Sequence, residues 1–241
     1  PIPLVGPVKK HFMEATVDEY VPIEDRVEKA TDRVTGWVKL RVKPNSEKKV
    51  AIILYDYPPG EENLGKASYL NTMESAARIL KGMAERGFRV EANVESGEDV
   101  KRLLLESGAV NSGEWVLIPE KAAAMPKLSV EEYVKWFSRI PEEARRKVLE
   151  SWGEPPGDIM VYGGGLLVPG VLLGNVFLGV QPSRGIHEKG KQYHKRDLPP
   201  HHQYLAFYYW LRNVFGAGAV IHLGTHGTLE FLPGKDVGLS S

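Results

Sequence analysis

The chain has 241 residues, of which 42% are hydrophobic and 26% are charged, the composition of a soluble globular protein with a sizeable core. Lysine plus arginine and aspartate plus glutamate both number 31, so the net charge is zero and indicates neither a nucleic-acid nor a membrane-surface partner. No stretch approaches the roughly 20 apolar residues that span a bilayer. The absence of cysteine excludes disulfides, thiolate metal sites and thiol nucleophiles, and it fits a cytoplasmic protein.

The first 45 residues are predicted to be a linker followed by a helix. Residues 1–22 contain four of the 17 prolines and show no clear period. Residues 24–42 carry apolar side chains at helical spacing, and a Lys-Pro-Asn-Ser run then ends the helix. The chain does not begin with Met and it stops soon after its most distinctive motif, so we expect an interior piece of a longer protein.

Residues 46–157 are predicted to form an α/β domain of the Rossmann-like kind. Residues 50–55 are a continuous apolar run rich in β-branched residues, which suits a strand buried on both faces. A helix near 66–86, an alternating strand over 88–94 and a helix over 97–107 follow, and this series predicts an open, mostly parallel sheet with flanking helices. Further predicted elements are a short strand over 115–118 and helices near 129–138 and 141–151.

Residues 158–241 are predicted to be part of a second α/β domain that is truncated at its C-terminus. Its first part, 158–180, indicates several short strands and makes the C-terminal half β-rich. The runs 166–168 and 171–173 flank Pro-Gly and are predicted to pair as a hairpin. A helix near 201–215 then leads to a last strand over 219–223.

A run of histidine, glycine and glutamate follows this last strand. His222 is the penultimate strand residue, and His226 and Glu230 follow at steps of four. In open α/β sheets ligands bind beyond the carboxyl ends of strands, and two imidazoles with a carboxylate can bind a divalent metal or transfer protons. Gly224 and Gly227 interrupt any helix, so the run does not predict a helical zinc site. Surface decoration or helix capping is equally compatible with these residues alone.

Two further groups carry candidate ligand-binding side chains. Gln181 and Arg184 follow a predicted strand, where arginine can hold a propionate or acetamide group, although a solvated loop arginine is an alternative. Four histidines also lie close in sequence: His187, His194, His201 and His202. They suit a metal site, or else the Pro-Pro-His-His run starts a helix whose tyrosines form its packed face.

The loop over 56–66 lies between a strand and a helix, where a phosphate loop would stand. It matches neither Gly-x-Gly-x-x-Gly nor Gly-x-x-x-x-Gly-Lys-Ser/Thr, so we assign no nucleotide to it. The loop is still expected at the carboxyl end of a strand, where it would line a cleft.

Several of these motifs, in this order, resemble the large-subunit family shared by aerobic cobaltochelatase and magnesium chelatase. The resemblance covers about residues 20–241, and several long motifs in one order are far more specific than any single one. The matching segments are 49–60, 63–65, 152–157, 174–177, 181–185, 197–208 and 222–230.

The resemblance implies a fragment of the tetrapyrrole-binding catalytic subunit of an ATP-dependent metal chelatase, which inserts Co²⁺ or Mg²⁺ as substrate metal into a corrin or porphyrin. ATP would be hydrolysed by separate AAA+ subunits, which agrees with the missing phosphate loop. The metal-binding and catalytic roles fall on His222, His226 and Glu230. Thr225 and Phe231 look more like the magnesium branch. The residues predicted to contact the tetrapyrrole are Gln181, Arg184, His201, His202, Thr225 and Lys235.

Two rival functions remain open at this stage. A stand-alone metallohydrolase would use the same two histidines and glutamate, and it predicts tight metal binding by the fragment. A non-catalytic binding or scaffold domain would keep its histidines for structure, and it predicts no tetrapyrrole binding.

Overall fold

The computed structural model describes residues 4–13, 15–55, 64–108, 119–183, 197–224 and 232–233. The chain divides into two compact units, and the larger one spans Pro44–Pro233. The smaller unit contains the predicted linker and helix. In the part of the chain that is described, no helix has the length and apolar character needed to cross a membrane.

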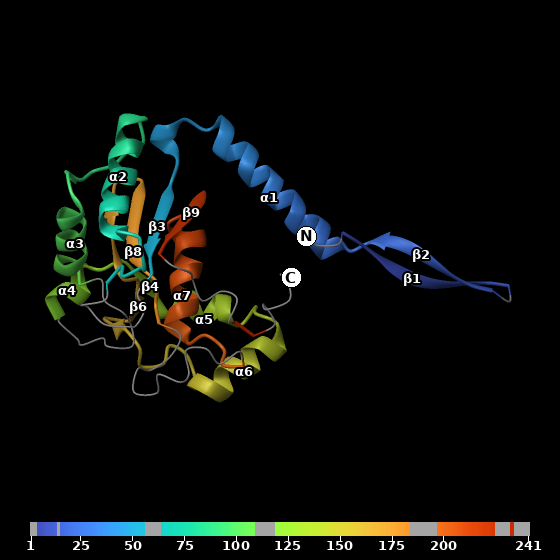
Figure 1. Ribbon diagram of the computed structural model, residues 1–241. Helices are drawn as coiled ribbons and strands as arrows, with labels where there is room; N and C mark the ends of the chain where they lie inside the picture. The colour runs from blue at the N-terminus through green and yellow to red at the C-terminus, as the bar shows by residue number, and fades with distance from the viewer. Residues whose placement is uncertain are drawn as a thin grey trace. The chain divides into compact units, whose positions relative to one another are not determined.

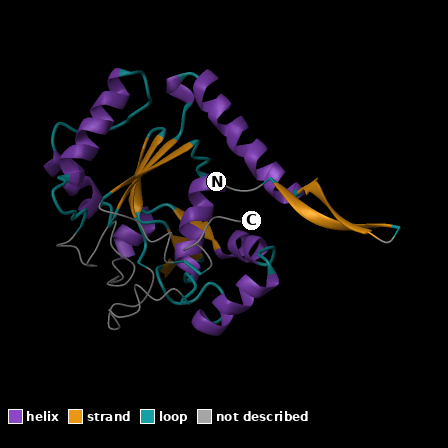
Figure 2. Ribbon diagram, turned by 45° about the vertical axis from the view of Figure 1, so that its right-hand side comes forward, coloured by secondary structure: helices purple, strands orange, loops and turns teal. Residues whose placement is uncertain are grey.

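The described residues of the smaller unit form a β-hairpin and one long helix. Strands β1 (Val5–Phe12) and β2 (Ala15–Pro22) pair antiparallel where the sequence predicted only a linker, and Figure 2 shows them as a two-stranded ribbon. Neither strand has a buried face, so the apolar alternation that reveals strands in a sequence is absent. The helix α1 (Glu24–Val42) confirms the prediction to the residue and buries none of its side chains.

A four-stranded sheet forms the centre of the larger unit, in the order β7-β8-β3-β9. The strand β3 (Val50–Leu54) runs parallel to both β8 (Val176–Val180) and β9 (Ala219–Leu223), while β7 (Gly170–Leu173) pairs antiparallel with β8. The prediction of an open, mostly parallel sheet is confirmed. The predicted domain boundary at residue 157 falls inside this unit, because the sheet combines strands from both sides of it.

Helices α2 (Thr72–Glu85) and α3 (Gly97–Glu106) cover one face of this sheet (Figure 1). Every residue of β3 is buried, and Ile52 and Leu54 pack with the two helices in one apolar cluster. The helices thus follow the pattern that the sequence indicated, although α2 begins six residues later than expected, at Thr72 rather than near 66.

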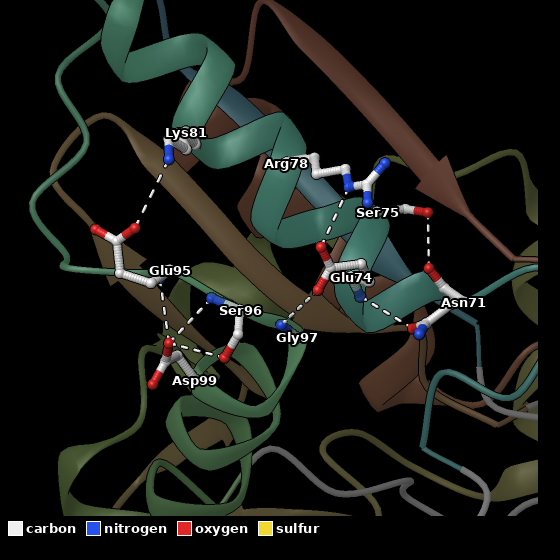
Figure 3. A network of polar contacts seen from close by, with 9 residues as sticks. All are labelled: Asn71, Glu74, Ser75, Arg78, Lys81, Glu95, Ser96, Gly97 and Asp99. Carbon is white, nitrogen blue, oxygen red and sulfur yellow. Dashed lines mark hydrogen bonds and ion pairs between the residues drawn. The ribbon is translucent and has the colours of Figure 1, made fainter.

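Polar side chains fix the first turns of these two helices (Figure 3). The Asn71 side chain accepts a hydrogen bond from the backbone N–H of Glu74 and caps α2. The Glu74 carboxylate in turn accepts a bond of 3.1 Å from the backbone N–H of Gly97, at the start of α3. Asp99 closes a capping box with Ser96. Side chains of both helices thereby bond to the backbone N–H groups of Ser96 and Gly97, where α3 begins.

The other face of the sheet is covered by α5 (Val130–Phe137), α6 (Glu142–Trp152) and α7 (His202–Tyr209). Ala51 and Ile53 of β3 point into this second cluster, so the central strand alternates between two cores. Figure 2 shows the strands between the two groups of helices. The remaining helical segments among the described residues are η1 (Asn45–Glu47), α4 (Pro119–Ala124) and a π-helical turn, η5 (Trp210–Val214), which continues α7.

The predicted strand over 88–94 is wrong, since the segment joins no sheet. It makes isolated hydrogen bonds beside the β7–β8 turn, from Glu91 N to Leu173 O and from Asn175 N to Arg89 O. Its alternation has a different cause, because three apolar side chains pack on the helix-covered core without a strand ladder: Phe88, Val90 and Ala92. The strand predicted over 115–118 lies outside the described residues.

The hairpin predicted around Pro-Gly at 169–170 is also wrong. Strand β6 (Gly165–Leu167) pairs with β4 (Lys127–Ser129) and β5 (Val161–Tyr162) in a separate three-stranded sheet, and the hairpin is instead β7–β8. A Cβ at Gly170 would collide with the ring of Phe177 and lie 2.6 Å from the carbonyl oxygen of Leu178. This glycine therefore serves a close backbone approach between strands rather than a turn.

Candidate functional site

The carboxyl ends of the three parallel strands meet at one edge of the sheet. The backbone N–H of Gln181, just after β8, donates to Leu54 O at 2.9 Å, and that of Tyr55, just after β3, donates to Leu223 O at 3.3 Å. A Cβ at Gly224, just after β9, would lie 2.7 Å from the Cβ of Tyr55. The edge therefore requires glycine at 224, and a ligand site is expected here in folds of this class.

A chain of polar contacts runs along this edge from Gln181 through Tyr208 to His222. The amide nitrogen of Gln181 donates to the hydroxyl of Tyr208 at 2.5 Å, and this hydroxyl lies 3.5 Å from Nε2 of His222, at the long limit of a hydrogen bond. The rings of Tyr208 and His222 are nearly parallel, with centroids 6.1 Å apart and planes at 18°. This polar chain joins β8, α7 and β9.

Burial sets the charge state of the polar chain. It raises the pKa of Tyr208 well above its usual value, so the phenol stays protonated. The side chain of His222 is exposed, yet neighbouring groups desolvate it in part and lower its pKa. A neutral imidazole offers a lone pair that can bind a metal or accept a proton.

The amide oxygen of Gln181 lies at one end of the polar chain. The residue is 3% exposed, and among the described residues this oxygen has no hydrogen-bond partner. An unsatisfied buried acceptor is costly, about 1–3 kcal/mol, so it indicates a partner that binds from outside the described protein groups.

The structure brings together two of the predicted site residues, Gln181 and His222. In the part of the chain that it describes, no group of three or more His, Asp or Glu could hold a metal. The metal set predicted from the sequence shares only His222 with that part, so it stays a prediction. Five other predicted site residues lie outside the described residues: Arg184, Thr225, His226, Glu230 and Lys235.

His201 is fully engaged with the protein. Its Nδ1 accepts from the backbone N–H of Tyr204 at 3.2 Å, which caps α7, and its Nε2 donates to Ser183 O at 2.7 Å. Burial lowers the pKa of His201 to about 4, so the ring is neutral at neutral pH. The ring links the segment after β8 to the start of α7, and its predicted contact with a ligand stays a prediction.

His202 is equally well satisfied. Its Nδ1 accepts from the hydroxyl of Tyr133 at 2.8 Å, and its Nε2 donates to Gly153 O at 2.9 Å. Nearby, the indole N–H of Trp152 donates to Pro199 O at 2.8 Å. The Trp-Gly-Glu-Pro-Pro-Gly and Leu-Pro-Pro-His-His motifs are thus hydrogen-bonded to each other, which gives both a structural role. A ligand contact by His202 is likewise untested.

Sequence reasoning missed the part that Tyr208 plays in the site. The spacing of Tyr204 and Tyr208 indicates a packed helix face, and both rings do pack, with centroids 5.2 Å apart. The hydroxyl of Tyr208 nevertheless reaches the sheet edge. The sequence carries no signal for this contact, because the helical spacing of Tyr208 indicates only that its ring packs.

A hollow of about 370 Å³ lies where α2 and α3 begin. Leu64 and Met73 line it together with Glu74, Glu98 and Lys101. At each helix N-terminus here a backbone N–H already bonds to a protein side chain, that of Glu74 to Asn71 and that of Gly97 to Glu74 (Figure 3).

Comparison with known proteins shows which family the chain matches. The whole chain, residues 1–241, matches the family described as CobN/Magnesium Chelatase. It is 38% identical to the aerobic cobaltochelatase subunit CobN of Pseudomonas aeruginosa over 95% of this chain and 18% of that protein. It is 35% identical to the chloroplastic magnesium-chelatase subunit ChlH of Oryza sativa over 90% of this chain and 15% of that protein.

A solved structure with this fold is the catalytic subunit of cobaltochelatase from Mycobacterium tuberculosis. It aligns with a TM-score of 0.80 and 34% identity over 97% of this chain and 20% of that one. The chain spans about one fifth of the length of the relatives it matches. On the match over its full length and on these relatives, the chain belongs to the CobN/magnesium chelatase family.

Proposed function

We propose that the full-length protein is the tetrapyrrole-binding catalytic subunit of a metal chelatase that inserts Co²⁺ or Mg²⁺ into a corrin or porphyrin ring. It would act in the cytoplasm with separate AAA+ subunits that hydrolyse ATP. The observation that carries the proposal is the match of the whole chain to subunits of both enzymes, in a fold whose strand ends gather Gln181, Tyr208 and His222.

Metal insertion exchanges two ring N–H protons for one divalent cation, so the site must hold a metal and accept protons. In our proposal His222, His226 and Glu230 do both, because neutral imidazole and carboxylate are metal ligands as well as bases. The free amide oxygen of Gln181 supports this arrangement, since it can accept a hydrogen bond from a bound ring. Arg184 would pair with a peripheral carboxylate or amide of that ring.

The two metals make different demands on such a site. Imidazole is a good ligand for Co²⁺, while Mg²⁺ prefers oxygen and keeps part of its water shell. A site with two imidazoles and one carboxylate serves either ion. The family match includes subunits of both enzymes and leaves this choice to experiment.

The test uses the full-length subunit with its purified partner subunits. The variants His226→Ala and Glu230→Ala should each abolish metal insertion into the ring while the circular dichroism spectrum stays that of the wild type. Wild-type insertion rates in both variants would refute the assignment of these residues.

Titration with a porphyrin and with a corrin, followed by fluorescence quenching and absorbance, identifies the substrate branch. Saturable binding of one ring supports the proposal. Absence of binding to either ring would favour a non-catalytic domain, and metal-dependent hydrolysis by the chain alone would favour a metallohydrolase.

A further inference from the structure

His222 occupies a position where its ring needs a support. It stands on the edge strand β9, opposite Ile53 in the register, with its side chain exposed on the face that α7 covers. Among the described residues, the ring makes its polar contact and its ring contact with Tyr208 alone. An exposed imidazole without such a support would sample several rotamers, whereas a metal-binding imidazole must be held in one orientation.

Tyr208 is itself held in place from several sides. The amide nitrogen of Gln181 donates to its hydroxyl at 2.5 Å, and the rings of Tyr204 and Phe207 each lie 5.2 Å from its own. Gln181 is buried and its backbone N–H is bonded to Leu54 O of the central strand. The position of the Tyr208 hydroxyl is therefore fixed by the core of the sheet rather than by the exposed ring that it touches.

We infer that Tyr208 is a positioning residue, whose hydroxyl, anchored by Gln181, fixes the ring of His222 through Nε2 and leaves Nδ1 to face the substrate. The phenol oxygen can accept hydrogen bonds from the Gln181 amide and from Nε2–H together. Among the described residues, no hydrogen bond engages Nδ1 of His222. This inference rests on the proposed function, because it assigns a task to His222 in that same site.

The test compares Tyr208→Phe with Tyr209→Phe in the full-length subunit. Both variants lose one hydroxyl from α7, but the Tyr209 hydroxyl bonds at 3.2 Å to the exposed Glu132 rather than to the sheet edge. The readouts are the dissociation constant for Co²⁺, the visible absorption bands of bound Co²⁺, and KM for the metal separately from kcat. Loss of a group that orients a metal-bound histidine weakens metal binding about 10–100-fold.

We expect Tyr208→Phe to weaken Co²⁺ binding by at least about tenfold, to alter the absorption bands and to raise KM for the metal, with tetrapyrrole affinity unchanged. Tyr209→Phe should stay within about twofold of the wild type. Gln181→Leu should weaken Co²⁺ binding as well, and adding it to Tyr208→Phe should cost little more, because the two residues act on His222 in series.

His222→Ala separates failure of this inference from failure of the proposed function. If His222→Ala loses Co²⁺ binding while Tyr208→Phe keeps the affinity and spectrum of the wild type, the positioning role is refuted and the proposed function stands. If His222→Ala changes neither Co²⁺ binding nor insertion, the role of His222 and the positioning role of Tyr208 are refuted while the chelatase function stands. Absence of insertion by the wild-type subunit with its partner subunits would refute the proposed function. Should Tyr208→Phe fail to fold, Gln181→Leu decides between the same outcomes.

Discussion

The buried imidazole of His201 predicts how the stability of the chain depends on pH. The ring is 1% exposed and its pKa in the folded chain is about 4, against about 6.5 when unfolded. Between these two values the unfolded chain binds more protons than the folded one, so stability falls as pH decreases. The contribution of His201 is present in full above about pH 6.5 and is lost progressively toward pH 4.

The size of the effect follows from the two pKa values. Lowering the pH from about 7.5 to about 5 should cost about 2 kcal/mol of unfolding free energy through His201, and the limit at lower pH is about 3 kcal/mol. Carboxylates with lowered pKa contribute below this window, since Glu74 and Asp99 titrate beneath their ordinary values of 4.5 and 3.8. The lowered pKa values of His202 and His222 also make the unfolding free energy fall as the pH decreases.

The variant His201→Asn isolates the contribution of His201 to the pH dependence of stability. Asparagine keeps a side-chain acceptor for the N–H of Tyr204 and so preserves the cap of α7, but it does not titrate. Urea unfolding of the 241-residue chain at the two pH values, followed by tryptophan fluorescence, gives the change in free energy for each protein. The wild type should lose about 2 kcal/mol more than the variant. Equal losses in the two proteins would refute a depressed pKa at His201.

Two further predictions concern the core that holds the site. Tyr133→Phe removes the hydroxyl that His202 accepts from and leaves a buried ring nitrogen unpaired, so it should lower the unfolding free energy by about 1–3 kcal/mol; an unchanged urea midpoint would contradict this. Gly170→Ala places a methyl group against Phe177 and should lower the unfolding free energy by about 1–3 kcal/mol. The control Gly36→Ala on exposed α1, where a Cβ would meet no atom within 4 Å, should not destabilise the chain. Similar losses of unfolding free energy in both variants would rule out the steric explanation.

The local elements of the fold were largely predictable because their signals are local. The apolar run at β3 and the helical spacing in α1, α3, α5 and α6 require only near neighbours in sequence. The partners of β3 were not predictable in this way. Its neighbours in the sheet are β8 and β9, which lie far along the chain, while the nearby segment at 88–94 alternates and yet forms no strand.

For the candidate site, the sequence predicted which kinds of side chain take part but not how they contact one another. His222 was predicted from its place near the end of an apolar strand, and the structure links it to Gln181 through Tyr208. The contact of Tyr208 with this site could not be predicted from the sequence. Its ring packs like that of any residue on the buried face of a helix, and only its hydroxyl points to the sheet edge. The ring of such a tyrosine packs in the core while its hydroxyl reaches a site. The helical periodicity of the sequence indicates only the packing of the ring.

Some of the motifs shared with the family have a structural role. Trp152 and His202 bind backbone carbonyls in each other's motifs, and they hold α7 where Tyr208 can reach the sheet edge. A substitution at either residue should displace Tyr208 and reduce activity through the fold, even if the residue itself does not touch substrate. Loss of activity at these two positions thus has to be compared with loss of stability in the same variant. A residue at the sheet edge, such as His222, should lose activity at nearly unchanged stability, because its side chain is exposed and contributes little to either core.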